Sequence, residues 1–263
     1  MPLVPPPRTA LPGQRSLNLP PPFRLVVLRE VGDAFAYACA HAGELGAGTL
    51  VFVGRFDLAE FAAVLEPEQP LAVARLAFYA GMVALGDALA AGAPPEKPIT
   101  IEWPDAIAVD RGLVGGGRLA WPDGCAESTV PDWLVFGAMI RTVSPSRTVA
   151  QAYPTATALA EEGFDDASAE LLAERFARHL MAAINRWQES SFAPLAREYS
   201  TKLMPDSRSR HDIADNGDLL VASPGRPTER RSLVSALRTH SWLDPAASGP
   251  LLEWPPPARR ARR

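Results

Sequence analysis

The alternation of apolar and polar positions predicts a series of short β-strands along the first 141 residues. Most candidates are apolar, β-branched runs bounded by Gly, Pro or Asp, the pattern typical of strands. They are Leu25–Arg29, Thr49–Val53, Phe61–Leu65, Ile99–Trp103, Ala106–Val109, Leu113–Trp121 and Trp133–Arg141. Short turns join the last four, which favours an antiparallel meander over alternating strand–helix–strand units.

Helical periodicity marks four further segments. A short helix capped by Asp33 extends through about His41, and Leu71–Ala91 is apolar nearly all round, which predicts one buried helix. Ser168–Glu189 has apolar residues every three or four positions, and a shorter helix follows over Phe192–Ser200. The predicted fold class is α+β: a mostly antiparallel sheet with packed helices, plus a small β-rich C-terminal domain.

Composition divides the chain into four expected parts. Proline, with 27 of 263 residues, is concentrated toward both ends, so residues 1–22 are predicted to be a proline-rich disordered arm. A main domain is expected over residues 23–203. Beyond it the chain becomes polar and Arg-rich, and Asn216-Gly217 is a turn signal before another strand, which predicts a small β-rich C-terminal domain over 204–254. Residues 255–263 form a basic tail.

Charge and composition exclude several classes of protein. A net charge of −4 argues against a nucleic-acid-binding protein, and 47% apolar residues indicate a globular fold. The longest uncharged run, Thr148–Ala160, is shorter than the ~20 apolar residues of a membrane-spanning helix, so we expect no membrane partner. Cys39 and Cys125 cannot form a disulfide framework, and the N-terminus lacks a secretory pattern, so we expect a cytoplasmic protein.

Glycines within the predicted strands suggest a binding site. The segments are Glu102-Trp103-Pro104-Asp105, Gly115-Gly116-Gly117-Arg118 and Gly137-Ala138. Glycine inside a strand is unfavourable unless a ligand or another backbone comes close, so both a ligand site and tight sheet packing remain open. The Gly-x-Gly-x-x-Ala match at Gly115 does not indicate dinucleotide binding, because strand and turn follow it instead of a helix.

With these segments in view, the chain resembles the biotin/lipoate protein ligase family over most of residues 23–222. The family signature Lys-Trp-Pro-Asn-Asp resembles Glu102–Ala106, and Lys-Leu-Ala-Gly resembles Gly112–Gly115. The family strand Val-x-Gly-x-Gly-Ile-Asn is similar to Val135–Arg141, and Asn216–Val221 is similar to the start of the small barrel that follows the catalytic domain. The pattern is closest to a divergent branch with a short uncharacterised C-terminal domain.

The resemblance implies an activity and its partners. Family ligases activate a small carboxylic acid with ATP and Mg²⁺ as an acyl-adenylate, then transfer the acyl group to a lysine of a carrier domain. By resemblance, the acid would be lipoate or a medium-chain acid such as octanoate before biotin, and the acceptor a lipoyl or biotinyl carrier domain. Two other functions stay open: a non-catalytic relative that binds the acyl ligand or carrier domain, and an acyltransferase that does not use ATP.

Departures from the family pattern leave the chain's enzymatic status open. The family lysine that stabilises charge at the α-phosphate is Gly112 here, and the phosphate loop is missing because Val53–Phe56 runs directly into the next strand. Glu102 replaces a lysine and Arg141 an asparagine. An ATP-independent transferase would need a nucleophile beside a base, and no such base is evident near Cys125.

Candidate site residues follow from the resemblance and from the chemistry of phosphate binding. We expect Arg118 and Arg141 to hold charge and Asp105 to assist, as the catalytic set; metal ligands are not assigned. The expected ligand-binding residues are Arg55, Trp103, Gly115, Gly116, Gly117, Gly137 and Ala138. The alternative for each arginine is an ordinary surface position in an Arg-rich protein.

Overall fold

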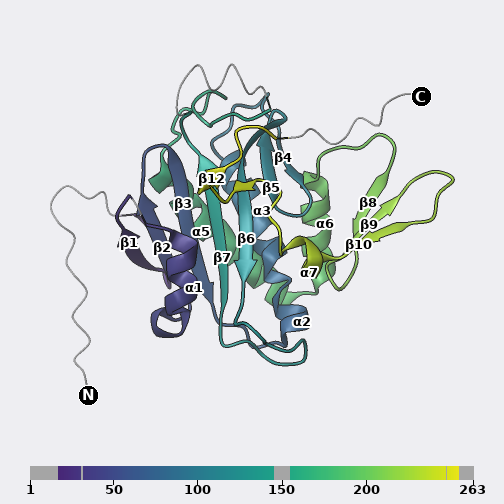
Figure 1. Cartoon of the computed structure of the whole chain (residues 1–263), viewed down its shortest axis with the longest axis horizontal. Coiled ribbons are helices and arrows are strands. Elements are labelled where there is room, and N and C mark those ends of the chain that lie inside the picture. The colour runs from purple at the N-terminus through teal and green to yellow at the C-terminus, as the bar shows by residue number, and fades with distance from the viewer. Residues whose placement is uncertain (1–16, 31, 145–154, 247, 255–263) are drawn as a thin grey trace.

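The computed structural model describes residues 17–30, 32–144, 155–246 and 248–254 (Figure 1). Most of the predicted arm, residues 1–22, lies outside the described residues, and so does the whole predicted tail, residues 255–263.

A seven-stranded sheet forms the centre of the fold, in the order β1-β2-β3-β7-β6-β5-β4. The strands are β1 (Arg24–Leu28), β2 (Thr49–Gly54), β3 (Leu58–Leu65), β4 (Ile99–Glu102), β5 (Ala106–Val109), β6 (Gly112–Ala120) and β7 (Leu134–Arg141). Only the β1–β2 pair is parallel among the pairs of this sheet. The predicted strands and the mostly antiparallel α+β class are confirmed.

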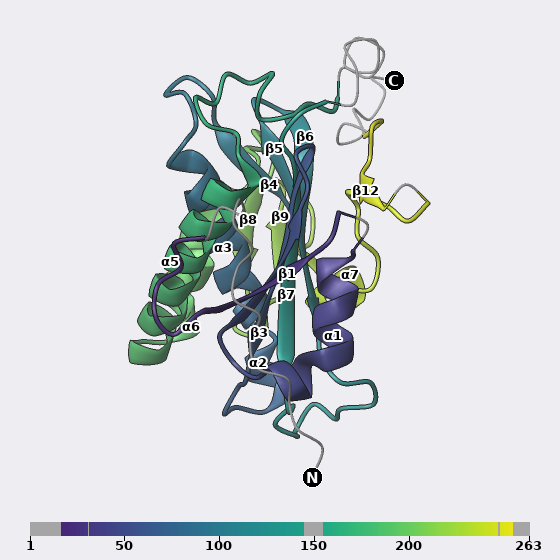
Figure 2. The same cartoon turned by 90° about the vertical axis from the view of Figure 1, so that its left-hand side faces the viewer.

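Helices cover the two faces of the sheet unequally (Figure 2). The broad layer consists of α3 (Ala77–Ala90), α5 (Ala169–Glu189) and α6 (Phe192–Lys202), and α1 (Ala34–Leu45) lies on the opposite face. Asp33 and Ser168 cap α1 and α5 through their side chains, as their positions predict. The main core lies between the sheet and the α3–α5 layer, where Phe61, Phe136 and Phe176 are fully buried.

The predicted single helix over 71–91 is two helices. α2 covers Leu71–Ala74, and at the break before α3 the backbone hydrogen bonds have i→i+3 spacing, as from Phe78 N to Arg75 O. By length and composition alone, Leu71–Ala90 could cross a membrane, so the expectation that no segment is long and apolar enough to do so is wrong. In the structure, 83% of the apolar window in this segment is buried inside the fold.

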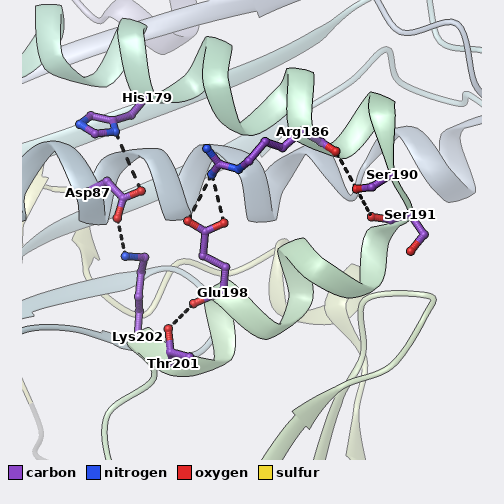
Figure 3. A network of polar contacts seen from close by, with 8 residues as sticks. All are labelled: Asp87, His179, Arg186, Ser190, Ser191, Glu198, Thr201 and Lys202. Carbon is purple, nitrogen blue, oxygen red and sulfur yellow. Dashed lines mark hydrogen bonds and ion pairs between the residues drawn. The ribbon is translucent and has the colours of Figure 1, made fainter.

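Polar contacts join the three helices of the broad layer (Figure 3). Asp87 on α3 accepts a hydrogen bond from Lys202 on α6 and lies 4.0 Å from Nδ1 of His179 on α5. Arg186 on α5 pairs with Glu198 on α6 at 3.1 Å. Lys202, one of two lysines in the chain, is thus committed to helix packing.

The C-terminal part begins with a small antiparallel sheet. It contains β8 (Arg210–Ile213), β9 (Leu219–Ala222) and β10 (Glu229–Arg231), followed by the short α7 (Leu233–Ala236). The Tyr79 hydroxyl on α3 donates to Gly217 O, which ties the turn before β9 to the main domain. The small β-rich element is confirmed, and its domain boundaries stay a prediction.

After α7 the chain crosses back over the large sheet. We call residues 240–246 and 248–254 the C-terminal strap. It includes β11 (Leu243–Asp244) and β12 (Gly249–Pro250), which pair with each other, and β12 lies against β6 and β7. In Figure 1 the strap is the yellow ribbon in front of the upper part of the sheet, on the same face as α1.

Candidate functional site

Strand register places several of the predicted residues on one face of the sheet. Directly opposed residues in an antiparallel pair share a face, and alternate residues along a strand share it too. Glu60 on β3 is opposite Met139 on β7, which is opposite Gly116 on β6. Arg118 and Arg141 belong to the same alternating set, so both guanidiniums start from the face that α1 and the strap cover.

Two apolar clusters divide this face. Near α1 the cluster contains Ala34, Ala38, Val51, Val53, Ala62, Val64 and Val135. Beneath the strap it contains Leu58, Ala106, Ala108, Leu113, Met139, Trp242 and Trp254. We define the candidate site as the charged residues along these clusters: Asp33, Glu60, Asp105, Arg118 and Arg141.

Arg118 lies at the start of α1. Its Nη2 is 3.2 Å from Oδ1 of Asp33, and its guanidinium carbon lies 4.2 Å from the centre of the Phe35 ring. Burial lowers the pKa of Arg118, while the negative charges of Asp33 and Glu60 oppose this shift. An arginine remains protonated in such a setting, so the site holds a fixed, half-buried cation.

Glu60 is a buried carboxylate beside this cation. It is 3% exposed, and its Oε1 accepts a hydrogen bond of 2.8 Å from the Ala34 amide at the first turn of α1. Burial raises the pKa of Glu60, and the Ala34 hydrogen bond and the charges of Arg118 and Arg55 only partly offset it. A carboxylate therefore already occupies the electropositive start of α1.

Arg141 is a buried cation at the other end of the site. It is 4% exposed, and its guanidinium donates to the carbonyls of Thr157 at 3.3 Å, Pro250 at 2.6 Å and Leu251 at 3.4 Å. Burial lowers its pKa, opposed by the charges of Glu161 and Asp57. Among the described residues, no carboxylate lies within ion-pair distance of Arg141.

Gly112, where the resemblance places the family lysine, faces away from this cation, because it is opposite Val109 of the main core whereas Arg141 is opposite Leu58 on the strap face. A Cβ on Gly112 would stand 2.6 Å from the Thr157 methyl group, and Thr157 is the residue whose carbonyl Arg141 binds. The Thr157 hydroxyl donates to Glu162, which also pairs with Lys97 at 2.9 Å. A side chain at position 112 would therefore point to the helix layer, and the structure does not bring Arg141 to that position.

Asp105 holds the strap. It is fully buried; its Oδ2 accepts from Nδ1 of His240 at 2.9 Å and its Oδ1 from the Ser241 hydroxyl at 3.1 Å. Both oxygens are therefore engaged, which does not fit a role as a metal ligand. Across the described parts of the chain, no group of three or more His, Cys, Asp and Glu side chains could hold a metal ion.

Other predicted residues lie elsewhere. Trp103 donates to the Tyr79 hydroxyl at 3.1 Å and packs against the main core. Gly117 faces Met82 and Phe136, and Ala138 belongs to the same core, so both point to the helix layer. Arg55, in the β2–β3 turn, pairs with Asp57 at 2.8 Å.

Gly116 and Gly137 make room for aromatic side chains of the chain itself. A Cβ on Gly116 would stand 2.4 Å from Nε1 of Trp242, and one on Gly137 would stand 2.4 Å from the Phe35 ring. Gly115 has φ 154° and its Cβ would meet the Met139 carbonyl at 1.9 Å, so only glycine fits there. Tight packing accounts for all three glycines, and their ligand-binding role stays a prediction.

Sequence reasoning missed Glu60 and Trp242 as residues of this face. A single glutamate inside the apolar run Leu58–Leu65 is a signal that could have singled out Glu60. Trp242 lies 126 residues from Gly116, and no local pattern connects the two.

The two arginines start from separate positions on the sheet. Arg118 is opposite Gly137, and Arg141 follows Gly137 by four residues on β7, so their backbone positions are ~13 Å apart along the strand. Fold and site together define an α+β domain with one half-buried and one buried cation on the same sheet face.

The comparisons place this domain in a family. The model of the biotin/lipoate A/B protein ligase family matches residues 19–201, more than half of the chain. The protein belongs to the biotin/lipoate A/B protein ligase family, which confirms the resemblance. The comparison with curated proteins gives no match.

Solved structures share the fold. A biotin protein ligase-like protein of unknown function from Silicibacter sp. TM1040 is 28% identical, with a TM-score of 0.72 over 84% of this chain and 98% of its own. The biotin protein ligase of Aquifex aeolicus is 16% identical, with a TM-score of 0.62 over 80% of this chain and 95% of its own. Its complex with biotin and ATP is also similar, with 15% identity, 78% and 94% coverage and a TM-score of 0.60. At this identity, the Aquifex structures show the fold alone.

Proposed function

We propose that this protein activates a small carboxylic acid with ATP and transfers the acyl group to a lysine of a carrier domain. The observation that carries the proposal is Arg141, a guanidinium that is 4% exposed and has no described carboxylate within ion-pair distance. A cation is needed at the reacting phosphate because negative charge builds up at the α-phosphate during adenylation. Arg141 supplies that charge from β7, the strand that pairs with β6.

The proposed reaction has two steps. An oxygen of the acid's carboxylate attacks the α-phosphorus of ATP, the bond to the β-phosphate oxygen breaks, and pyrophosphate leaves. The amine of the carrier lysine then attacks the acyl carbon, AMP leaves and the amine loses a proton. Arg141 stabilises the phosphate charge, and Arg118 holds the polar end of the ligand near α1 by charge-assisted hydrogen bonds.

Apolar side chains around the two cations support an aliphatic acid. Leu58, Met139 and Val53 are buried on this face, and Phe35 flanks Arg118. Such a lining suits a hydrocarbon chain, so we propose lipoate or octanoate before biotin.

One observation favours the non-catalytic alternative. The spaces over Gly116 and Gly137 contain Trp242 and Phe35, so protein side chains fill part of this face. A thiol-based transferase has less support. Burial raises the pKa of Cys39 to about 11 and outweighs the positive charge of Arg118, which lowers it. The reactive thiolate form of Cys39 is therefore disfavoured.

Pyrophosphate release from Mg-ATP tests the proposal, with lipoate, octanoate and biotin each supplied to the purified full chain. Release with one acid is expected, and Arg141→Ala and Arg118→Ala should each reduce it ~100-fold or more, the usual effect of removing a charge-stabilising donor. Arg197→Ala, an exposed arginine on α6, is the matched control and should leave the rate unchanged.

Carrier transfer is read as a mass increase on a lipoyl or biotinyl domain. Because the chain has only two lysines, both ion-paired, acylation of the protein itself is easily mapped and separated from transfer. Absence of pyrophosphate release with every acid, from folded protein and from the strap variants below, would falsify the adenylation proposal. Acid or carrier binding measured by calorimetry would then support the non-catalytic alternative.

A further inference from the structure

The C-terminal strap is attached to the charged groups of the candidate site. His240 and Ser241 engage both oxygens of Asp105, and the carbonyls of Pro250 and Leu251 accept from Arg141. Each contact uses a polar group that an incoming ligand would otherwise meet. The strap therefore covers Arg141, to which the proposed function assigns a role, and Asp105.

Aromatic anchors hold the strap on the sheet. Trp242 is fully buried, lies over Gly116 and directs its Nε1 to the Gly117 carbonyl at 3.3 Å. Trp254 is 4% exposed, and its amide donates to the Thr155 hydroxyl at 3.1 Å. The anchors lie near the two ends of the strap, with the β11–β12 pair between them.

The strap is not part of the sheet's hydrogen-bond ladder. Within the described ranges, no backbone–backbone hydrogen bond joins it to the seven strands; its ladder contacts are internal, such as Leu251 N to Trp242 O at 2.7 Å. An element held by side chains can leave without breaking strand pairing. Its departure would expose Arg141, Asp105 and the Gly116 strand.

The hydrogen-bond partners of Arg141 suggest why the strap would leave. A guanidinium binds a phosphate or carboxylate through charge-assisted bonds that are about twice as strong as those to neutral acceptors. Within the part of the chain that the structure describes, Arg141 has only neutral carbonyls as partners, two of them from the strap. An anion that reaches Arg141 therefore competes with the strap for the same donors.

We infer that the C-terminal strap is an intramolecular inhibitor of the ligand face, which it leaves when an anionic nucleotide or acyl-nucleotide binds to Arg141. This inference rests on the proposed function for the identity of the ligand. A ligand can bind only to molecules in which the strap has left the face. The apparent affinity is therefore the intrinsic affinity multiplied by the fraction of molecules in which the face is open. Weakening the strap should therefore strengthen ligand binding.

Accessibility of Arg141 tests the strap without relying on activity. Full-length wild type, Trp254→Ala and Trp242→Ala are treated with phenylglyoxal, and modification of Arg141 is followed by peptide mass spectrometry. Both variants should modify Arg141 about tenfold faster or more, because loss of a buried aromatic anchor shifts the docking equilibrium at least that far. Arg197 is the internal control, and Trp187→Ala, on α5 in the helix layer, controls for general loss of stability.

Hydrogen exchange gives the second readout. In wild type, adding Mg-ATP with octanoate should speed amide exchange in the peptide covering residues 241–254. Trp254→Ala should also release pyrophosphate faster than wild type. Unchanged Arg141 modification in both strap variants, or slower exchange of the strap with ligand bound, would overturn the inference.

The two proposals fail in different ways. Equal pyrophosphate release by wild type and strap variants would refute inhibition and leave the ligase function standing. Faster Arg141 modification without any pyrophosphate release would refute the ligase function and leave the strap as a cover over an anion-binding face.

Discussion

Substitution of Gly116 by alanine should force Trp242 off the sheet. The new methyl carbon would stand 2.1 Å from the Asp105 carbonyl oxygen, 2.4 Å from Nε1 and 2.6 Å from Cδ1 of Trp242. Ordinary contacts between such atoms need about 3.5 Å, so the indole must move ~1 Å. The Asp105 carbonyl cannot yield freely, since it accepts from Gly117 N at 3.0 Å.

The expected cost follows from these contacts. Overpacking a rigid core costs about 1–3 kcal/mol, and weakening the Asp105–Gly117 hydrogen bond adds ~1 kcal/mol. Replacing a strand glycine with alanine recovers about 0.5–1 kcal/mol of backbone entropy. Gly116→Ala should therefore lower the free energy of unfolding by about 1–3.5 kcal/mol.

Gly54→Ala is the matched control, because a Cβ there has nothing within 4 Å. It should leave stability unchanged or raise it by up to ~1 kcal/mol. Urea unfolding monitored by circular dichroism and by tryptophan fluorescence measures both variants, with m-values compared to confirm that the transition is unchanged. Equal stabilities for Gly116→Ala and Gly54→Ala would show that Trp242 does not occupy this position on β6.

Two further predictions concern the buried carboxylate and the glycines of helices. Burial raises the pKa of Glu60, so its stabilising contribution is present below the unfolded-state pKa and is lost as pH rises through the folded-state value. Glu60→Gln should accordingly gain stability relative to wild type as pH rises from about 4.3, in urea titrations at several pH values; a difference independent of pH would contradict this. Gly43→Ala, with open space around its Cβ in α1, should stabilise by ~1 kcal/mol. Gly81→Ala in α3 should destabilise by about 1–3 kcal/mol, because its Cβ would stand 2.3 Å from the Phe136 ring; thermal melts that rank the two the other way would refute the packing.

The local sequence pattern was sufficient to predict the helices and strands and to identify the family. The strands β5 (Ala106–Val109) and β7 (Leu134–Arg141) lie where alternation predicts them, and α5 begins after Ser168 as its capping residue indicates. These features depend on residues within a few positions of one another, so the sequence carries them directly. The resemblance to the ligase family is likewise a property of sequence, and membership of the family is confirmed.

The tertiary structure decided which residues share a face. A step of one residue moves a side chain to the opposite face of a sheet, and a register shift between Ile107 and Ala108 interrupts the β5–β6 pairing. Gly116 therefore faces the strap while Gly117 faces the helix layer, although the sequence presents them as one glycine triplet.

The contents of the site were also decided only by folding. Trp242 over Gly116, the strap carbonyls on Arg141 and the Ala34 amide on Glu60 join residues far apart along the chain. Such contacts depend on how separate elements pack, and no periodicity or spacing encodes them. The sequence alone therefore determined a ligase-family chain, and the fold determined that Arg141 lies buried on one sheet face with the chain's own C-terminal segment across it.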